Sequence, residues 1–188
     1  MKYTTLAVSC LLFAAPVVAF AQSTGEGTAV QSTTISRRTQ DFVNQVAVSD
    51  LFETASAKLA QANGNEAGKK FANQMIEDHS KTSSELKRIM LAVSSKAEIP
   101  SQLDFPHQRK LDELNNARGE NFSSLYAAQQ VEAHREAVAL FEQYANGGDQ
   151  PELKAWAGQT LPALKHHLEM AQQVAEEKTP TVGSSTSK

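Results

Sequence analysis

The sequence predicts an all-α protein: a ferritin-like four-helix bundle in which a long crossover containing a short helix joins two helical hairpins. Four segments of the 188-residue chain repeat apolar residues at helical spacing. Short turns separate the first segment from the second and the third from the fourth. About 25 residues, 95–119, separate the second from the third, against a usual connection of a few residues. Two tight hairpins and one long crossover are the connectivity of a ferritin-like bundle.

The two ends of the chain are expected to lie outside the bundle. Residues 1–21 combine a positive start, an apolar stretch too short to span a bilayer and an A-x-A sequence ending at Ala21, which predicts a cleaved signal peptide. Residues 22–36 predict a flexible lead-in, and residues 179–188 predict a disordered tail. The bundle is therefore expected over residues 37–178, in a periplasmic or secreted protein.

Composition narrows the expected partners. The single cysteine, Cys10, lies in the predicted signal peptide, so no disulfide is expected in the mature chain. No later apolar run approaches the roughly 18 residues that a membrane span needs. Loss of Lys2 changes the formal net charge from -3 to -4, and the other basic residues form no block. We therefore expect no transmembrane segment in the mature chain and no nucleic-acid binding. Oligomeric state is not predicted.

The first hairpin is predicted from two stripes of inward-facing residues and the turn sequence Asn63-Gly64-Asn65. The stripe over residues 42–60 consists of Phe42, Val46, Glu53, Ala57 and Ala60. The stripe over residues 72–93 consists of Ala72, Met75, Ile76, His79, Leu86, Ile89, Met90 and Val93.

The crossover contains Pro100 and Pro106, which end the preceding helical pattern. An amphipathic piece over residues 107–116 then predicts a short helix with Leu111 and Leu114 facing inward.

The second hairpin is predicted in the same way, around the turn sequence Asn146-Gly147-Gly148. Asp149 is the expected N-cap of its second helix, with Pro151 in the first turn and Glu152 completing a capping box. The first stripe consists of Phe122, Leu125, Val131, His134, Val138 and Phe141. The second consists of Leu153, Ala157, Leu164, His167, Ala171 and Val174.

One polar residue interrupts the apolar stripe of each long segment, near its middle. These residues are Glu53, His79, His134 and His167. Inward ligands from facing helices are how helical bundles build metal sites. Three imidazoles and one carboxylate suit a single Zn, Cu, Fe or Mn ion. Asp78 points about 100° away from His79, so it is an exposed acid by default and a candidate hydrogen-bond acceptor beside the ligands.

A metal-free interpretation stays open, because a histidine on an apolar face is usually hydrogen-bonded to a neighbour. In that interpretation Glu53 accepts from one imidazole, and the others bond to hydroxyls such as those of Thr160 or Tyr126. The protein would then be a structural, interaction or stress-related module of the cell envelope that binds a partner protein.

Catalysis has less support from the sequence. No G-x-S-x-G motif and no phosphate-binding glycine loop is present, and no catalytic residue is assigned. A metal-dependent redox enzyme acting on peroxide or superoxide would also need an open coordination position. We therefore expect a binding protein in preference to an enzyme.

Several motifs of the chain match a known family. The most specific are Asp78-His79-Ser80 and Leu161-Pro162-x-Leu164-x-x-His167-Leu168. With these motifs the chain is similar to the DUF4142 family of exported bacterial proteins, over about residues 39–173. The resemblance implies a ferritin-like four-helix fold in the cell envelope, and it implies no established activity.

The histidine motifs differ from those of di-iron bundle proteins, in which Glu-x-x-His supplies bridging carboxylates. The residues three positions before the three inward histidines are Ile76, Val131 and Leu164. A di-iron centre is therefore not expected, and neither is ferroxidase or iron-storage activity. A site for one metal ion is the most that this pattern predicts.

Overall fold

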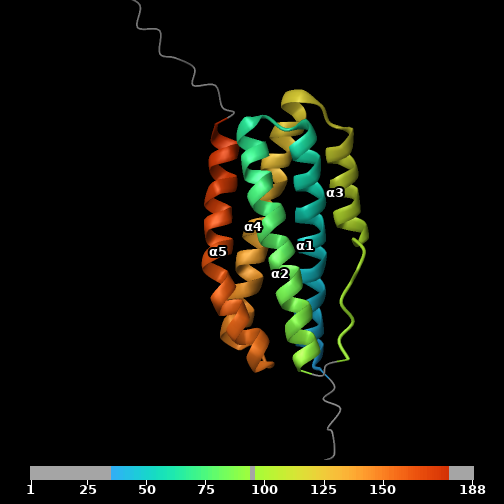
Figure 1. Cartoon of the computed structure of the whole chain (residues 1–188), viewed down its shortest axis with the longest axis vertical. Helices are drawn as coiled ribbons and strands as arrows, with labels where there is room; N and C mark the ends of the chain where they lie inside the picture. The colour runs from blue at the N-terminus through green and yellow to red at the C-terminus, as the bar shows by residue number, and fades with distance from the viewer. Residues whose placement is uncertain (1–34, 94–95, 178–188) are drawn as a thin grey trace, which may run out of the picture. The chain divides into compact units, whose positions relative to one another are not determined.

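A computed structural model describes residues 35–93 and 96–177, which fall within one compact unit. The predicted signal peptide, residues 22–34 of the lead-in and the predicted tail lie outside these described residues. The described chain forms five helices (Figure 1): α1 (Arg37–Asn63), α2 (Glu66–Ala92), α3 (Phe105–Asn116), α4 (Gly119–Gly147) and α5 (Pro151–Glu176). The prediction of an all-α bundle is confirmed.

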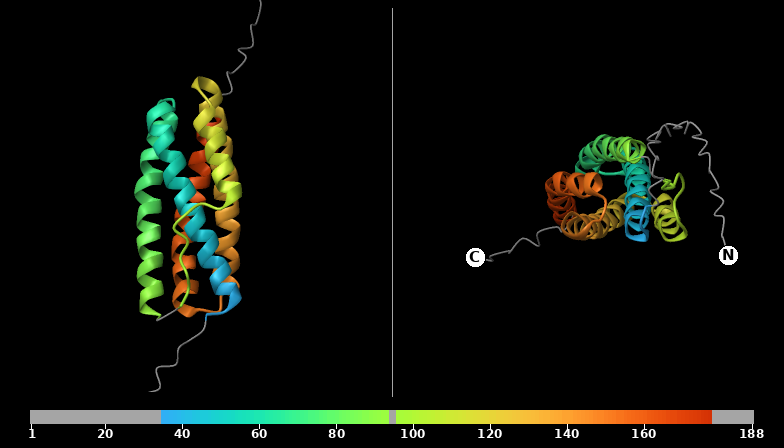
Figure 2. Two further views of the ribbon diagram at one scale, coloured as in Figure 1. Left: turned by 90° about the vertical axis from the view of Figure 1, so that its right-hand side faces the viewer. Right: turned by 90° about the horizontal axis from the view of Figure 1, so that it is seen from below.

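The four long helices form two hairpins, α1 with α2 and α4 with α5. The hairpins pack side by side, so that α1 lies along α4 and α2 lies along α5 (Figures 1 and 2). The crossover returns along the bundle, and α3 packs on the outside against α1 and α4. As a result α2 and α4 run in the same direction (Figure 1). None of the described helices is long and apolar enough to cross a membrane.

The first hairpin turns where the sequence predicts. Gly64 follows α1, and a Cβ at this position would lie 2.5 Å from the carbonyl oxygen of Ala60, so the close approach requires glycine. Asn65 then caps α2, because its Oδ1 accepts a hydrogen bond from the backbone N–H of Gly68 at 2.9 Å. Turn and cap together explain why only two residues separate the helices.

The cap of α5 differs from the prediction. Gln150, not Asp149, is the N-cap, and its Oε1 accepts from the backbone N–H of Leu153 at 2.8 Å. Asp149 lies one residue earlier, and its Oδ1 accepts from the hydroxyl of Thr39 at 2.7 Å. The aspartate therefore connects the turn of the second hairpin to the start of α1.

Most of the predicted inward residues are buried. Those at the edges of the stripes are only half-buried, because they lie where neighbouring helices meet solvent: Ile76, Val93, Leu111, Leu125, Val131 and Val138. For these six positions the prediction of a fully inward side chain was too strong.

The core consists of two apolar clusters, one toward each end of the bundle. The first cluster includes Phe42, Leu86, Phe141, Trp156 and Leu164. The second includes Ala57, Met75, Phe122, Tyr126 and Ala171. Along each long helix a set of buried polar residues separates the two clusters, and we call this set the polar layer. It contains Asp50, Glu53, Ser56, His79, Gln130, His134 and His167, each at most 4% exposed.

Candidate metal centre

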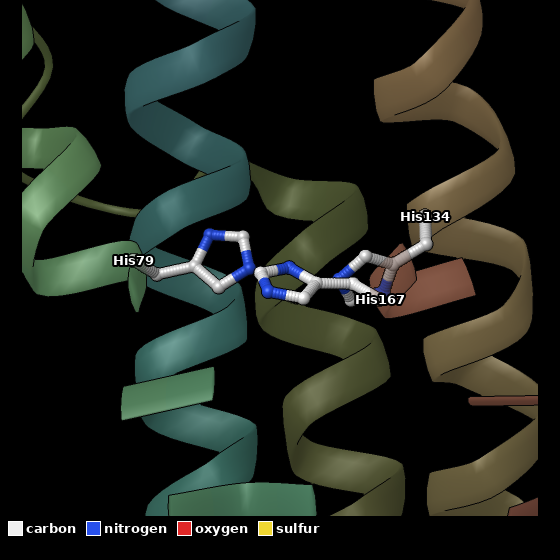
Figure 3. Close-up of side chains that lie close together, drawn as sticks. All are labelled: His79, His134 and His167. Carbon is white, nitrogen blue, oxygen red and sulfur yellow. The ribbon is translucent and has the colours of Figure 1, made fainter. Parts of the chain in front are cut away.

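Three of the four predicted site residues meet in the polar layer. His79 on α2, His134 on α4 and His167 on α5 each offer one ring nitrogen, and these nitrogens all lie within 4.8 Å of one another. The ring centroids are 5.6, 5.7 and 5.5 Å apart, so the three rings form a nearly equilateral triangle. Figure 3 shows the rings reaching into the bundle from three different helices.

The size of this triangle fits a metal ion. A point equidistant from the three centroids, in their plane, lies about 3.2 Å from each. A metal bound at about 2.0–2.1 Å to a ring nitrogen lies at about the same distance from the ring centre. Nitrogens bound to one ion in a trigonal arrangement are about 3.5 Å apart, so small rotations of the rings suffice to close the site.

The hydrogen bonds of His79 and His134 leave one nitrogen of each ring free. Nδ1 of His79 donates to Oδ1 of Asp50 at 2.9 Å. Nδ1 of His134 donates to the backbone carbonyl oxygen of Gln130 at 2.9 Å. Because a carboxylate and a carbonyl can only accept, both bonds place the ring proton on Nδ1 and the lone pair on Nε2. Neither Nε2 has a hydrogen-bond partner in the described part of the chain.

His167 has the same arrangement with its nitrogens exchanged. Its Nε2 donates to Oδ2 of Asp78 at 2.8 Å, and its Nδ1 is buried without a partner among the described residues. All three imidazoles thus have one nitrogen held by an acceptor and the other available as a ligand. Metal-binding histidines in proteins are held in this way by acceptors behind them.

The pKa shifts keep two of the rings neutral. Burial lowers the pKa of His134 to about 3, helped by the positive charge of His79. Burial also lowers the pKa of His167, although Asp78 opposes this. Burial acts to lower the pKa of His79 too, but its hydrogen bond to Asp50 and the nearby carboxylates raise it overall. His79 is therefore the imidazole of the three that most readily holds a second proton.

Glu53, the fourth predicted residue, is buried beside the cluster but is not among the atoms that meet within 4.8 Å. Neither of its carboxylate oxygens has a hydrogen-bond partner of good geometry among the described residues. Burial raises its pKa to about 7, although the charge of His79 and the nearby amide of Gln130 oppose the shift. Glu53 is therefore a buried acid group of the polar layer that lacks a well-aligned hydrogen-bond donor within residues 35–93 and 96–177.

The metal-free network that the sequence left open does not form with the expected partners. The acceptors of the three rings are Asp50, Asp78 and a backbone carbonyl, and Glu53 is none of them. The hydroxyl of Tyr126 is buried without a partner in the described chain, and burial and the charge of Glu53 raise its pKa.

Sequence reasoning missed Asp50 and understated Asp78. Asp50 is 3% exposed, and its Oδ2 also accepts from the hydroxyl of Ser83 at 2.9 Å. The missed signal is its spacing, because Asp50 lies four residues after Val46 and three before Glu53, on the same helical stripe. Asp78 is not a free surface acid, since it accepts from both His167 and Gln74.

Fold and site together define a helical-bundle protein with a buried three-histidine cluster, in which an acceptor fixes the orientation of each ring. The chain belongs to the DUF4142 family, described as a domain of unknown function, whose family model matches residues 24–174. The family resemblance seen in the sequence is thereby confirmed. No curated protein matches the chain.

One solved structure with a similar fold is described as "CopM in the Cu(II)-bound form". The alignment covers 73% of this chain and 95% of the CopM chain, with a TM-score of 0.62 and 19% sequence identity. At this identity the similarity shows a shared helical-bundle fold.

Proposed function

We propose that this protein is exported to the periplasm and binds one transition-metal ion between His79, His134 and His167, without catalytic turnover. The observation that carries the proposal is that three buried histidines each bring one ring nitrogen within 4.8 Å of the other two, and that each ring also has a nitrogen without a partner among the described residues. Leaving a buried polar atom unsatisfied costs about 1–3 kcal/mol. Three such atoms, one on each ring of a close cluster, are best explained by a ligand that all three rings bind.

Cu(II) is the leading ion. Imidazole suits Cu, Zn, Fe and Ni, and among divalent ions of this series the affinity of a nitrogen site is highest for Cu(II). A bundle of similar fold is described in a Cu(II)-bound form, which supports this choice. Glu53 remains the candidate fourth ligand of this proposal, supported by its burial in the polar layer and by carboxylate oxygens without a partner among the described residues.

The test is metal analysis of the purified mature protein, titrated with Cu(II), Zn(II), Fe(II) and Mn(II). We expect about one ion per chain, with Cu(II) displacing the others, and nitrogen hyperfine structure in the electron paramagnetic resonance spectrum of the Cu(II) form. His79→Ala is expected to abolish binding. His166→Ala is the matched control, because His166 adjoins His167 but is exposed and outside the cluster. A wild-type protein that binds none of the four ions would overturn the proposal.

A second candidate is an envelope interaction module. Leu91 and Phe105 are apolar and 83% and 80% exposed, which favours contact with a partner protein. In this case the variant Leu91→Ser with Phe105→Ser would lose a partner recovered by crosslinking in the periplasm, and a triple substitution of the cluster histidines would not.

A further inference from the structure

The crossover passes over the side of the bundle formed by α1 and α4 (Figure 2). Residues of all three line a cleft of about 440 Å³. The crossover supplies Leu103, Asp104 and His107 to its walls. Two of its buried lining residues are Asp50 and His79, each 3% exposed. The cleft therefore runs from the surface to one imidazole of the three-histidine cluster.

The cluster is closed along the axis of the bundle. The first apolar cluster lies on one side of the polar layer and the second lies on the other, and both draw side chains from all four long helices. A hydrated ion cannot pass through such packed apolar layers without a large desolvation cost. An ion must therefore approach the three histidines from the side, between helices.

The charges that line the cleft favour a cation. Three of its described lining residues are acidic, namely Asp50, Asp104 and Glu136, and none of its described lining residues is Lys or Arg. Asp104 and Glu136 are exposed, whereas Asp50 is buried, so the carboxylates extend from the outer part of the cleft to its inner end. A cleft lined by one sign of charge between low-dielectric walls raises the local concentration of the opposite charge.

We propose that a hydrated divalent cation reaches the three-histidine site along this cleft, attracted by Asp104 and Glu136, and that His79 is the first imidazole to bind it. His79 lines the cleft, and its Nε2 is buried without a partner among the described residues. This inference rests on the proposed metal-binding function and adds the route by which the site fills and empties.

A different lateral route serves as the comparison. Asp78 is 32% exposed and bonds to His167, so the edge between α2 and α5 is the other side on which a cluster histidine comes near the surface. Gln74 is exposed and donates to Asp78 at 2.7 Å, which makes it a suitable position for covering this edge. Bulky substitutions on the two sides distinguish the routes.

The experiment measures rates of uptake and release of Co(II), followed by its visible absorption in a stopped-flow instrument, with the dissociation constant measured separately. Leu140→Trp narrows the cleft, because Leu140 is half-buried in its wall. We expect uptake and release to slow by the same factor, at least tenfold, with the dissociation constant unchanged within twofold. Gln45→Trp, at an exposed lining position, should slow both rates in the same direction without disturbing the core. Gln74→Trp should leave both rates unchanged.

The electrostatic part is tested with Asp104→Asn combined with Glu136→Gln, since asparagine retains the N-cap that Asp104 provides to α3. Uptake should slow about three- to tenfold and lose most of its dependence on ionic strength. The control is Glu77→Gln, an exposed acid on α2 that does not line the cleft. Slower exchange in Gln74→Trp with normal exchange in Leu140→Trp and Gln45→Trp would overturn the inference. A wild-type protein that binds no ion at equilibrium would instead overturn the proposed function itself.

Discussion

Asp50 and His79 occupy the central positions of two 27-residue helices, α1 and α2, and the carboxylate of one accepts from the ring of the other at 2.9 Å. The pair thus joins the two helices of the first hairpin at half their length. It also leaves Nε2 of His79 without a partner among the described residues, as an acceptor bonded to the other nitrogen of a metal-binding histidine does. Four predictions follow from this arrangement and from its neighbours.

Asp50→Asn is expected to weaken metal binding about 10- to 100-fold without unfolding the protein. An asparagine can still accept from His79, but it lacks the negative charge that makes the imidazole a better ligand. The measurement is a competition titration with a chelator of known affinity. Asp41→Asn, an exposed change of the same kind on α1, should leave the affinity unchanged. Equal affinities for wild type and Asp50→Asn would show that Asp50 does not support the ligand.

Glu53→Gln is expected to have opposite effects on stability and on binding. The folded-state pKa of Glu53 is about 7 against 4.5 for the free side chain, so the folded protein holds this proton more tightly than the unfolded chain. Stability is therefore lost as pH rises from about 4.5 to 7. At pH 8 the neutral amide should stabilise the metal-free protein by about 1–3 kcal/mol, as measured by urea denaturation.

The same Glu53→Gln change should weaken metal binding about tenfold by removing the carboxylate. A metal-free Glu53→Gln protein that is less stable than wild type at pH 8 would show that the carboxylate is satisfied within the fold.

Metal affinity is expected to fall as the pH is lowered. The pKa of His79 is raised above 6.5. A second proton therefore competes with the ion for this imidazole at every pH below the raised pKa. The lowered pKa values of His134 and His167 make those rings compete only in more acidic solution. Titrations between pH 5.5 and 8.5 should show no proton released at the alkaline end and up to two released per ion at the acidic end, one from His79 and one from Glu53, with about a tenfold loss of affinity per pH unit for each proton displaced. An affinity that does not change over this range would be inconsistent with His79 as a ligand.

His134→Leu and His79→Leu should both abolish binding but change the stability of the metal-free protein in opposite directions. Among the described residues His134 bonds only to a backbone carbonyl of its own helix, so leucine removes an unsatisfied nitrogen and leaves no other side chain without its partner. We expect a gain of about 1–2 kcal/mol. His79→Leu leaves the buried carboxylate of Asp50 without its imidazole, and we expect a loss of about 3 kcal/mol. Thermal unfolding with a chelator present measures both. Destabilisation by His134→Leu would favour a structural network over a metal site.

The fold was predictable because helical spacing, turn residues and connection lengths are local properties of the sequence. The three histidines were predictable for the same reason, since each interrupts an apolar stripe. Their acceptors were not. An acidic residue on a helix usually faces solvent, and whether Asp78 reaches His167 depends on how α2 and α5 are rotated against each other, which the spacing within one helix does not specify.

Asp50 illustrates a different limit. Asp50 lies on the inward stripe of α1, four residues after Val46 and three before Glu53. The predicted stripe went directly from Val46 to Glu53, seven residues further on, and so omitted Asp50. The position of Glu53 outside the group of three nitrogens depends on the packing of α1 against α4, which is also a property of the whole bundle. Sequence patterns can thus nominate ligands, but the distances among them require the assembled helices.

The separation of the core into two apolar clusters has a consequence for how such proteins diversify. Each cluster draws side chains from all four long helices at its own end of the bundle, and the seven buried residues of the polar layer lie between the two. If the proposed ion binds in the polar layer, substitutions there would change which ion is bound, or remove binding, while the apolar side chains at either end keep their neighbours. The hydrophobic packing at either end of the bundle is therefore separate, in its residues, from the polar layer between the two clusters.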